Sequence, residues 1–110
     1  MKFPIQEELL NELKEKSKNS EKEICGFLIK KNNVYSEFVE CFNSHPDPVN
    51  YFLISPKQCV FEDDSILFHS HPLHSDLIGF SDWDLENQQY FYLKMVVYSV
   101  KNNEFYYQTI

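Results

Sequence analysis

The segment His69-Ser70-His71-Pro72 combines residue types and a spacing that can bind a metal ion. Side chains two positions apart on a strand point to the same face, roughly 7 Å apart at about 3.3 Å per residue. Two imidazoles placed in this way can converge on one zinc ion. A bare His-x-His pair more often marks two surface histidines, but this pair ends an apolar run, residues 66–68, that is typical of a buried strand. That position favours a metal site.

A catalytic zinc ion requires a third protein ligand and leaves one position open for water. The downstream carboxylates Asp76, Asp82 and Asp84 are all available for this role. Asp84 stands three residues after Ser81, in a pattern that predicts a capped helix start, whereas Asp76 falls in a predicted loop that would hold it less firmly. The residue types alone leave the choice open.

A water activated by zinc also needs a nearby base, which takes up its proton and passes it to the leaving amine. Glu23 is one candidate, because it stands directly before the apolar run 24–29. It could equally be the last charge of a solvated connector. Glu21, Glu37 and Glu40 compete with it for the role.

Hydrophobic periodicity and turn signals predict the elements that would position these residues. Apolar residues at helical spacing indicate a helix over residues 5–18, and a second helix begins behind Ser81. Strands are predicted over residues 23–29, 34–42, 51–54, 65–69, 95–100 and 104–109, a short helix over residues 55–64, and loops over residues 43–50 and 72–80. This order predicts a single α+β domain over residues 1–110, a curved mixed β-sheet with helices packed against it.

The composition narrows the class of protein. Apolar residues make up 43% and charged residues 25% of the chain, as in ordinary globular proteins. The net charge of −7 disfavours nucleic acid and anionic membranes as partners. No apolar run approaches the roughly 20 residues of a membrane helix. The three cysteines form no C-x-x-C pair, and the first residues lack the apolar segment of a secretory signal, which together predict a reduced, cytoplasmic protein.

Three short motifs follow one another in a specific order. Glu23-Ile24-Cys25-Gly26 opens a strand, His69-Ser70-His71-Pro72 ends one, and Ser81-Asp82-Trp83-Asp84 opens a helix. In this order they resemble the JAMM motif of the JAB/MPN zinc metallopeptidase family. Residues 43–56 are also similar to a loop, strand and helix of bacterial and phage members, such as the N-terminal domain of phage tail-assembly protein K. The resemblance extends from about the first helix to the last strand.

The resemblance implies a JAB/MPN-like fold and a zinc-dependent hydrolase of peptide or isopeptide bonds. His69, His71 and Asp84 would bind Zn2+. Glu23 would act as general base and then as general acid, and Ser81 would donate a hydrogen bond to the oxyanion of the tetrahedral intermediate. The substrate would be a protein or peptide: the C-terminal tail of a ubiquitin-like or sulphur-carrier protein, or a phage tail component.

The spacing between the second histidine and the aspartate departs from the family pattern. Twelve residues separate His71 from Asp84, two more than is usual, and strict counting would select Asp82. Gly79 would then stand in the place of Ser81. We expect Asp84 to be the ligand, because the Ser-x-x-Asp geometry is local whereas loop length varies freely. Asp82 would be rotated by about 200° from Asp84 around the helix, so both cannot point at one ion.

Two other functions remain open at this stage. Many MPN relatives have lost their metal ligands and act as scaffolds, so a catalytically inactive interaction module is the main alternative. A fragment of a cell-wall hydrolase is disfavoured, because the sequence contains no second peptidase domain. All five polar positions of the motif are present, which favours the active enzyme.

Overall fold

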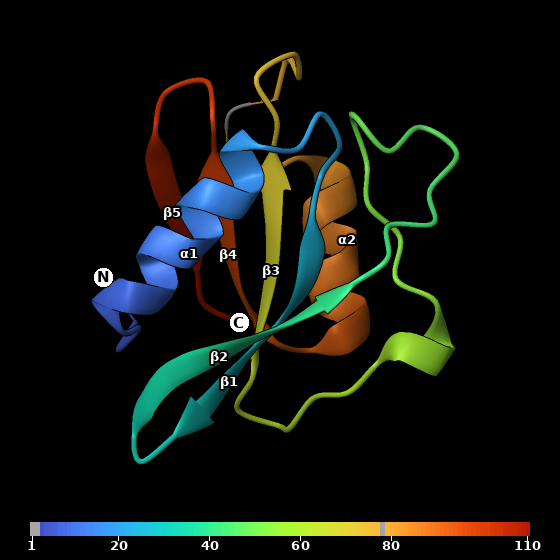
Figure 1. The fold of residues 1–110 in the computed structure, drawn as a ribbon. Helices are drawn as coiled ribbons and strands as arrows, with labels where there is room; N and C mark the ends of the chain where they lie inside the picture. Colours follow the sequence, from blue (N-terminus) through green and yellow to red (C-terminus); the bar gives the residue numbers. More distant parts are fainter. Residues whose placement is uncertain (1–2, 78) are drawn as a thin grey trace.

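The structure is a computed structural model that describes residues 3–77 and 79–110. Two α-helices and five strands follow one another along the chain (Figure 1). Their bounds are α1 Glu7–Lys18, β1 Cys25–Lys31, β2 Val34–Cys41, β3 Ile66–His71, α2 Asp82–Phe91, β4 Lys94–Ser99 and β5 Glu104–Gln108, with a single 3-10 turn, η1, at Pro56–Gln58. Most predicted elements are present with ends shifted by one or two residues.

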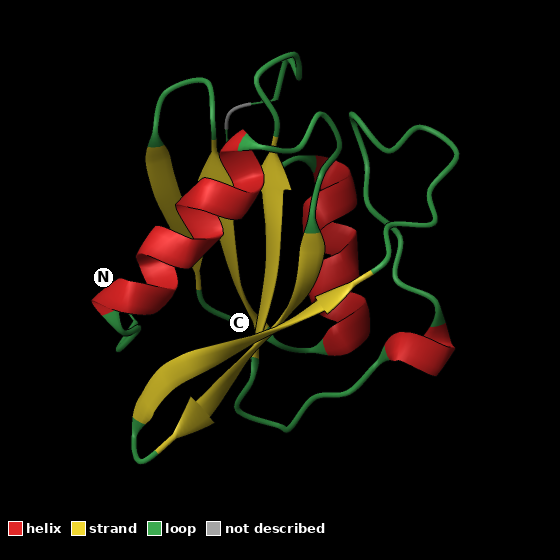
Figure 2. Cartoon of the chain, in the orientation of Figure 1, coloured by secondary structure: helices red, strands yellow, loops and turns green. Residues whose placement is uncertain are grey.

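The five strands form one mixed sheet in the order β2-β1-β3-β4-β5. Strands β3 and β4 are parallel and are connected through α2, whereas every other neighbouring pair is antiparallel. Figure 2 shows this sheet strongly twisted, with one α-helix on each side of it. The predicted α+β class, with a mixed sheet and helices packed against it, is therefore confirmed.

Alternation along the strands divides the core into two layers. On the α1 side, Leu9 and Leu13 of the helix pack with Ile66, Phe68 and other buried residues of the strands. On the α2 side, alternate residues of the same strands pack with Phe91, the last residue of that helix, and with Leu93, which follows it. His69 and His71 continue this second alternation, so the sheet directs both imidazoles toward α2.

Two features of the β1–β2 hairpin depend on backbone geometry: its two-residue turn and the close approach of its strands at a glycine. Asn32 and Asn33 occupy the turn with positive φ angles of 52° and 67°, as a two-residue hairpin turn requires. Gly26 lies so close to β2 that an added Cβ would stand 2.2 Å from the carbonyl oxygen of Val39. The glycine of the Glu-x-Cys-Gly motif is thus required by the packing of two strands.

The segment between β2 and β3 corrects two predictions. Residues 51–54 form no strand, because the side chain of Asn43 bonds the backbone of Tyr51 and Leu53 in place of a neighbouring strand. The predicted helix over residues 55–64 is reduced to η1, and Ser55 makes no capping hydrogen bond. The Gln58 side chain instead accepts a hydrogen bond from the backbone of Phe42 at 2.6 Å.

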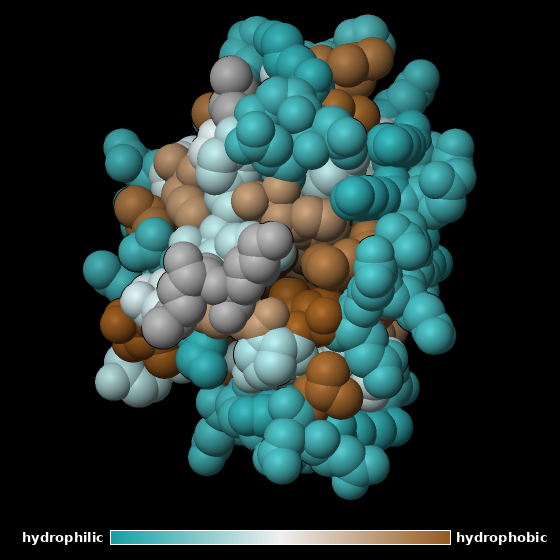
Figure 3. Space-filling model, turned by 90° about the vertical axis from the view of Figure 1, so that its left-hand side faces the viewer, coloured by the Kyte–Doolittle hydropathy of each residue, from teal (hydrophilic) through white to brown (hydrophobic). Residues whose placement is uncertain are grey.

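The surface is largely hydrophilic on the side drawn in Figure 3, where hydrophobic residues gather in the middle of the face between hydrophilic ones. Among the described residues, no helix combines the length and apolar character needed to cross a bilayer.

Candidate metal centre

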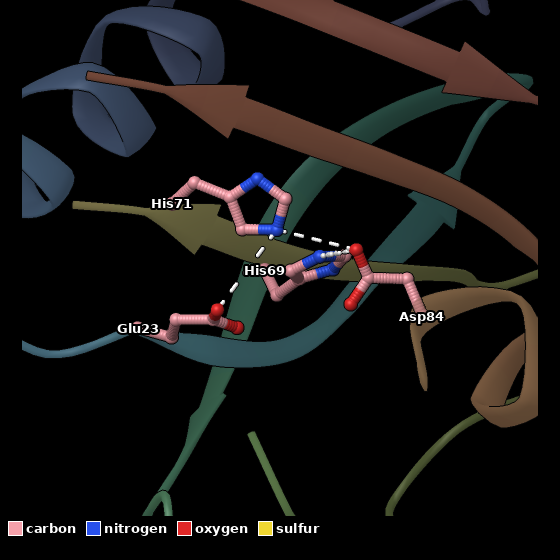
Figure 4. A group of neighbouring side chains, drawn as sticks. All are labelled: Glu23, His69, His71 and Asp84. Carbon is pink, nitrogen blue, oxygen red and sulfur yellow. Dashed lines mark hydrogen bonds and ion pairs between the residues drawn. The ribbon is translucent and has the colours of Figure 1, made fainter. Parts of the chain in front are cut away.

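Four buried side chains from three separate parts of the chain meet at one point (Figure 4). His69 and His71 come from the end of β3, Asp84 from the first turn of α2, and Glu23 from the connection that enters β1. Each residue offers one nitrogen or oxygen atom, and these four atoms lie within 4.8 Å of one another. All four side chains are at most 1% exposed, so the cluster could hold a metal ion away from bulk solvent.

The separations between these atoms suit a small cation. Asp84 Oδ2 lies 3.1 Å from His69 Nε2 and 3.2 Å from His71 Nε2, and Glu23 Oε2 lies 3.9 Å from His71 Nε2. In a tetrahedral zinc site with bonds of about 2.0–2.2 Å, neighbouring ligand atoms stand roughly 3.3–3.5 Å apart. The two histidines and Asp84 are therefore near the separation of metal ligands, with Glu23 beyond them.

Unpartnered polar atoms are concentrated in the same cluster. Six buried side-chain nitrogen or oxygen atoms lack a hydrogen-bond partner in the described part of the chain, and five of them belong to Glu23, His69 and His71. His69 Nε2 is among them although it lies 3.1 Å from Asp84 Oδ2. Such an atom costs about 1–3 kcal/mol when it is left without a partner. A bound cation would supply partners for several of them at once.

The electrostatics keep the histidine and aspartate in the states that bind metals. Complete burial lowers the pKa of His69, outweighing the attraction of Asp84, so the imidazole is neutral. Burial alone would raise the pKa of Asp84, but the nearby imidazoles of His69 and His71 and the backbone N–H of Ser81 lower it well below its usual value. A neutral imidazole and a carboxylate are the forms that bind zinc.

Glu23 has the opposite electrostatic state. Burial, followed by the negative charges of Asp84 and Asp47, raises the pKa of Glu23 to about 10. Without a cation the side chain is therefore a neutral acid at pH 7. A divalent ion beside it would favour the ionised form and lower this pKa.

The start of α2 fixes Asp84 through a capping box. The hydroxyl oxygen of Ser81 accepts a hydrogen bond from the backbone N–H of Asp84 at 3.1 Å, and Asp84 Oδ2 accepts one from the backbone N–H of Ser81 at 2.9 Å. The same Oδ2 faces both histidines. Asp82 is exposed, and so is Asp76. The structure thus places Asp84, and neither of its competitors, beside the histidines, with Ser81 tied to it.

Backbone contacts hold Glu23 against the histidine strand. Ser70, which stands between the two histidines, accepts a hydrogen bond at Oγ from Ile24 N at 2.9 Å, and its own N–H donates to Ile24 O at 3.0 Å. Asn43 donates to the carbonyl of Glu23 at 3.0 Å, and the N–H of Glu23 donates to Pro48 O at 2.7 Å. Glu23 therefore precedes β1 instead of opening it, and its position is fixed by β3 and by the connection between β2 and β3.

The competing residues lie elsewhere. Glu37 and Glu40 form surface ion pairs with Lys31 and Lys16, and Glu21 is exposed. Of the two remaining histidines, His74 is exposed and His45 is half-buried, with the His45 ring 4.8 Å from that of Tyr51 and 5.3 Å from that of Trp83.

Phe52 and Asn43 support the cluster, and sequence reasoning missed both. The Phe52 ring stacks on His69, with centroids 4.6 Å apart and an interplanar angle of 23°. Trp83 Nε1 donates a hydrogen bond to Phe52 O at 2.8 Å, which joins this support to α2. A lone Phe and a lone Asn in a loop carry no spacing signal, so neither could have been found without the structure.

A cavity of about 350 Å³ adjoins the cluster at Ser81. Its other lining residues come from the connection between β2 and β3, the loop after β3 and the start of α2: Asp47, Asn50, Tyr51, Asp76, Leu77, Asp82 and Trp83. The cavity therefore lies on the side of the cluster on which Ser81 is placed, and none of the four cluster residues lines it.

Compared with models of known protein families the sequence matches none, and a comparison with curated protein sequences finds no significant match either.

Proposed function

We propose that this protein is a zinc-dependent hydrolase of peptide or isopeptide bonds, of the JAB/MPN type. The observation that carries the proposal is the buried convergence of His69, His71 and Asp84 around unpartnered nitrogen atoms, with the buried carboxyl group of Glu23 beside them. Two imidazoles and one carboxylate form a ligand set that suits zinc and leaves a position for water.

In this proposal the chain's own residues divide the chemistry among them. When bound, zinc would supply a water of lowered pKa and polarise the substrate carbonyl. Glu23, ionised beside the cation, takes a proton at its carboxylate and then gives it to the leaving amine nitrogen. The Ser81 hydroxyl oxygen accepts from Asp84 N, which leaves the O–H free to donate to the developing oxyanion. The cavity beside Ser81 admits the substrate.

The substrate class proposed is an extended protein tail, either of a ubiquitin-like or sulphur-carrier protein or of a phage tail component. The hydrolysed carbonyl must reach Ser81 through the cavity that Tyr51 and Trp83 line, because the ligand side chains themselves are buried. A flexible terminus fits this approach better than a folded surface does.

The test is the metal content of the purified protein together with that of four variants: two single histidine variants, their combination and a control. Native mass spectrometry should find one zinc ion per chain in the wild-type protein. His69→Ala and His71→Ala should each lose tight binding, because each removes a nitrogen ligand. Asp76→Ala is the control and should keep the metal, because Asp76 is exposed at the cavity mouth. Full zinc content in the double histidine variant would refute the site, and a metal-free wild-type protein would favour the scaffold function.

A further inference from the structure

Within residues 3–77 and 79–110, the one buried unpartnered side-chain atom outside the metal centre is Ser99 Oγ, at the end of β4. Ser99 is completely buried, and a buried hydroxyl without a hydrogen bond is costly enough to need an explanation. The proposed hydrolase chemistry makes no use of it.

The sheet register places Ser99 beside His71. In the parallel β3–β4 ladder, His71 is paired with Ser99, and Leu67 is paired with Met95. Paired residues of neighbouring strands point to the same face of a sheet, and Leu67 and Met95 both belong to the core layer on the α2 side. Four residues further along each strand, His71 and Ser99 point to that side as well.

The unpartnered atoms of these two neighbours are complementary. His71 Nε2 faces the carboxylates of Asp84 and Glu23, at 3.2 and 3.9 Å. The other ring nitrogen, Nδ1, is buried without a partner. When Nε2 binds a metal, the neutral ring carries its proton on Nδ1, which must then donate to an acceptor.

We infer that Ser99 is a positioning residue for the metal centre, whose hydroxyl accepts the Nδ1–H hydrogen bond of His71. Because Ser99 and His71 are register partners on the same face of the sheet, a rotation of Ser99 about Cα–Cβ can turn its oxygen toward the His71 ring. The contact fixes the tautomer in which Nε2 presents its lone pair to the cluster. This inference rests on the proposed metal site and adds to it a residue outside the three motifs.

The two histidines then have different supports. His69 stacks on Phe52, and its own neighbour on β4 is Val97, which offers no hydrogen-bonding side chain. His71 has a hydroxyl at the equivalent place. Only His71 should therefore depend on β4 for the orientation of its ring.

The test compares zinc affinity with the stability of the metal-free protein in Ser99→Ala and Ser99→Thr. Titration of zinc against a chromophoric chelator should show a 10–100-fold larger dissociation constant for Ser99→Ala. This is the usual effect of removing a hydrogen-bond partner of a metal-bound histidine. Ser99→Thr keeps the hydroxyl and should stay within about threefold of wild type. Ser17→Ala, at a serine that is equally buried in α1, is the matched control and should bind zinc normally.

Thermal unfolding of the metal-free proteins separates positioning from a merely structural role. Without metal the Ser99 hydroxyl has no partner in the structure, so the metal-free Ser99→Ala variant should melt at or above the wild-type temperature while its zinc affinity falls. Wild-type affinity in Ser99→Ala, or equal losses in the alanine and threonine variants, would overturn the inference without touching the metal site. A wild-type protein that binds no zinc would overturn both, and only that result concerns the proposed function itself.

Discussion

At the residue scale, the centre combines groups whose charge states are set by their surroundings. Asp84 is ionised because two imidazoles and a backbone N–H surround it, whereas Glu23, a few ångströms away, is a neutral acid until a cation arrives. The pKa values of two carboxyl groups with similar intrinsic acidity are thus shifted in opposite directions. A pair of this kind suits a site in which one carboxylate binds a metal and the other carries protons.

Glu23→Gln should separate metal binding from hydrolysis. The substitution keeps the shape of the side chain but removes the group that takes the proton, so we expect full zinc content and at least a 100-fold loss of turnover, the size of a general-base contribution. The measurement pairs zinc content with cleavage of a ubiquitin-like fusion protein. Turnover that survives in the zinc-loaded variant would remove Glu23 from the mechanism.

Asp84→Ala and Asp82→Ala form a matched pair two residues apart. Asp84 is buried against both histidines, so its replacement should lose zinc and activity together. Asp82 is exposed in the same helical turn, so its replacement should keep both, at a cost to stability of about 0.3–1 kcal/mol from the helix dipole. Zinc content by mass spectrometry distinguishes the two variants, and the reverse pattern would show that loop spacing sets the register of the ligand.

At the element scale, three connections bring the centre together. Strand β3 supplies both histidines, the capping box of α2 supplies Asp84, and Ser70 binds the chain at Ile24 so that Glu23 reaches the cluster. Because α2 follows β3 in the β3–α2–β4 crossover, the histidines and Asp84 are close in the sequence as well as in space. Glu23 is far from them in the sequence, and its position depends on contacts with β3 and with the connection between β2 and β3.

Gly26→Ala tests how closely β1 and β2 must approach. The added Cβ would meet backbone and ring atoms of β2 at 2.2 and 2.8 Å, so we expect a loss of at least about 3 kcal/mol in the free energy of unfolding. Gly79→Ala is the control, because its added Cβ has no neighbour within 4 Å and should change stability by less than about 0.5 kcal/mol. Urea denaturation measures both, and equal stabilities would show that the sheet edge shifts freely.

The sequence could predict those parts of the site that depend on local patterns. The apolar strand before His69 and the cap at Ser81 are short-range signals, and both elements are present. The segment over residues 51–64 was mispredicted, because its conformation depends on the side chains of Asn43 and Gln58, which reach it from outside any periodic pattern. The support that Phe52 gives to His69 also comes from that segment, and no spacing rule could have revealed it.

At the scale of the whole molecule, a metal ion would join segments that are far apart in the chain. Glu23, His71 and Asp84 span more than half of the sequence. An ion bound by all three would cross-link these segments and close the chain loops between them, in addition to the closure that the sheet provides. The metal should therefore act on the cooperative stability of the domain as well as on its chemistry.

Zinc should raise the melting temperature of the wild-type protein. At a free zinc concentration of 100 times the dissociation constant, linkage adds about 2.7 kcal/mol, which corresponds to roughly 10 °C for a domain of this size. The double variant His69→Ala/His71→Ala should show no shift, and a chelator should return the wild-type protein to its metal-free melting temperature. Differential scanning calorimetry checks all three. A shift that persists in the double variant would place the stabilising ion elsewhere.

The chain has a single tryptophan, Trp83, which precedes Asp84, lines the cavity beside Ser81 and bonds the backbone of Phe52. Its side chain thus lies at the cavity on one side and at the support of His69 on the other. Excitation at the red edge of protein absorption selects this one chromophore. The protein consequently carries its own optical reporter beside the cluster, and its emission should change when an ion binds the cluster or a ligand enters the cavity, with no label attached.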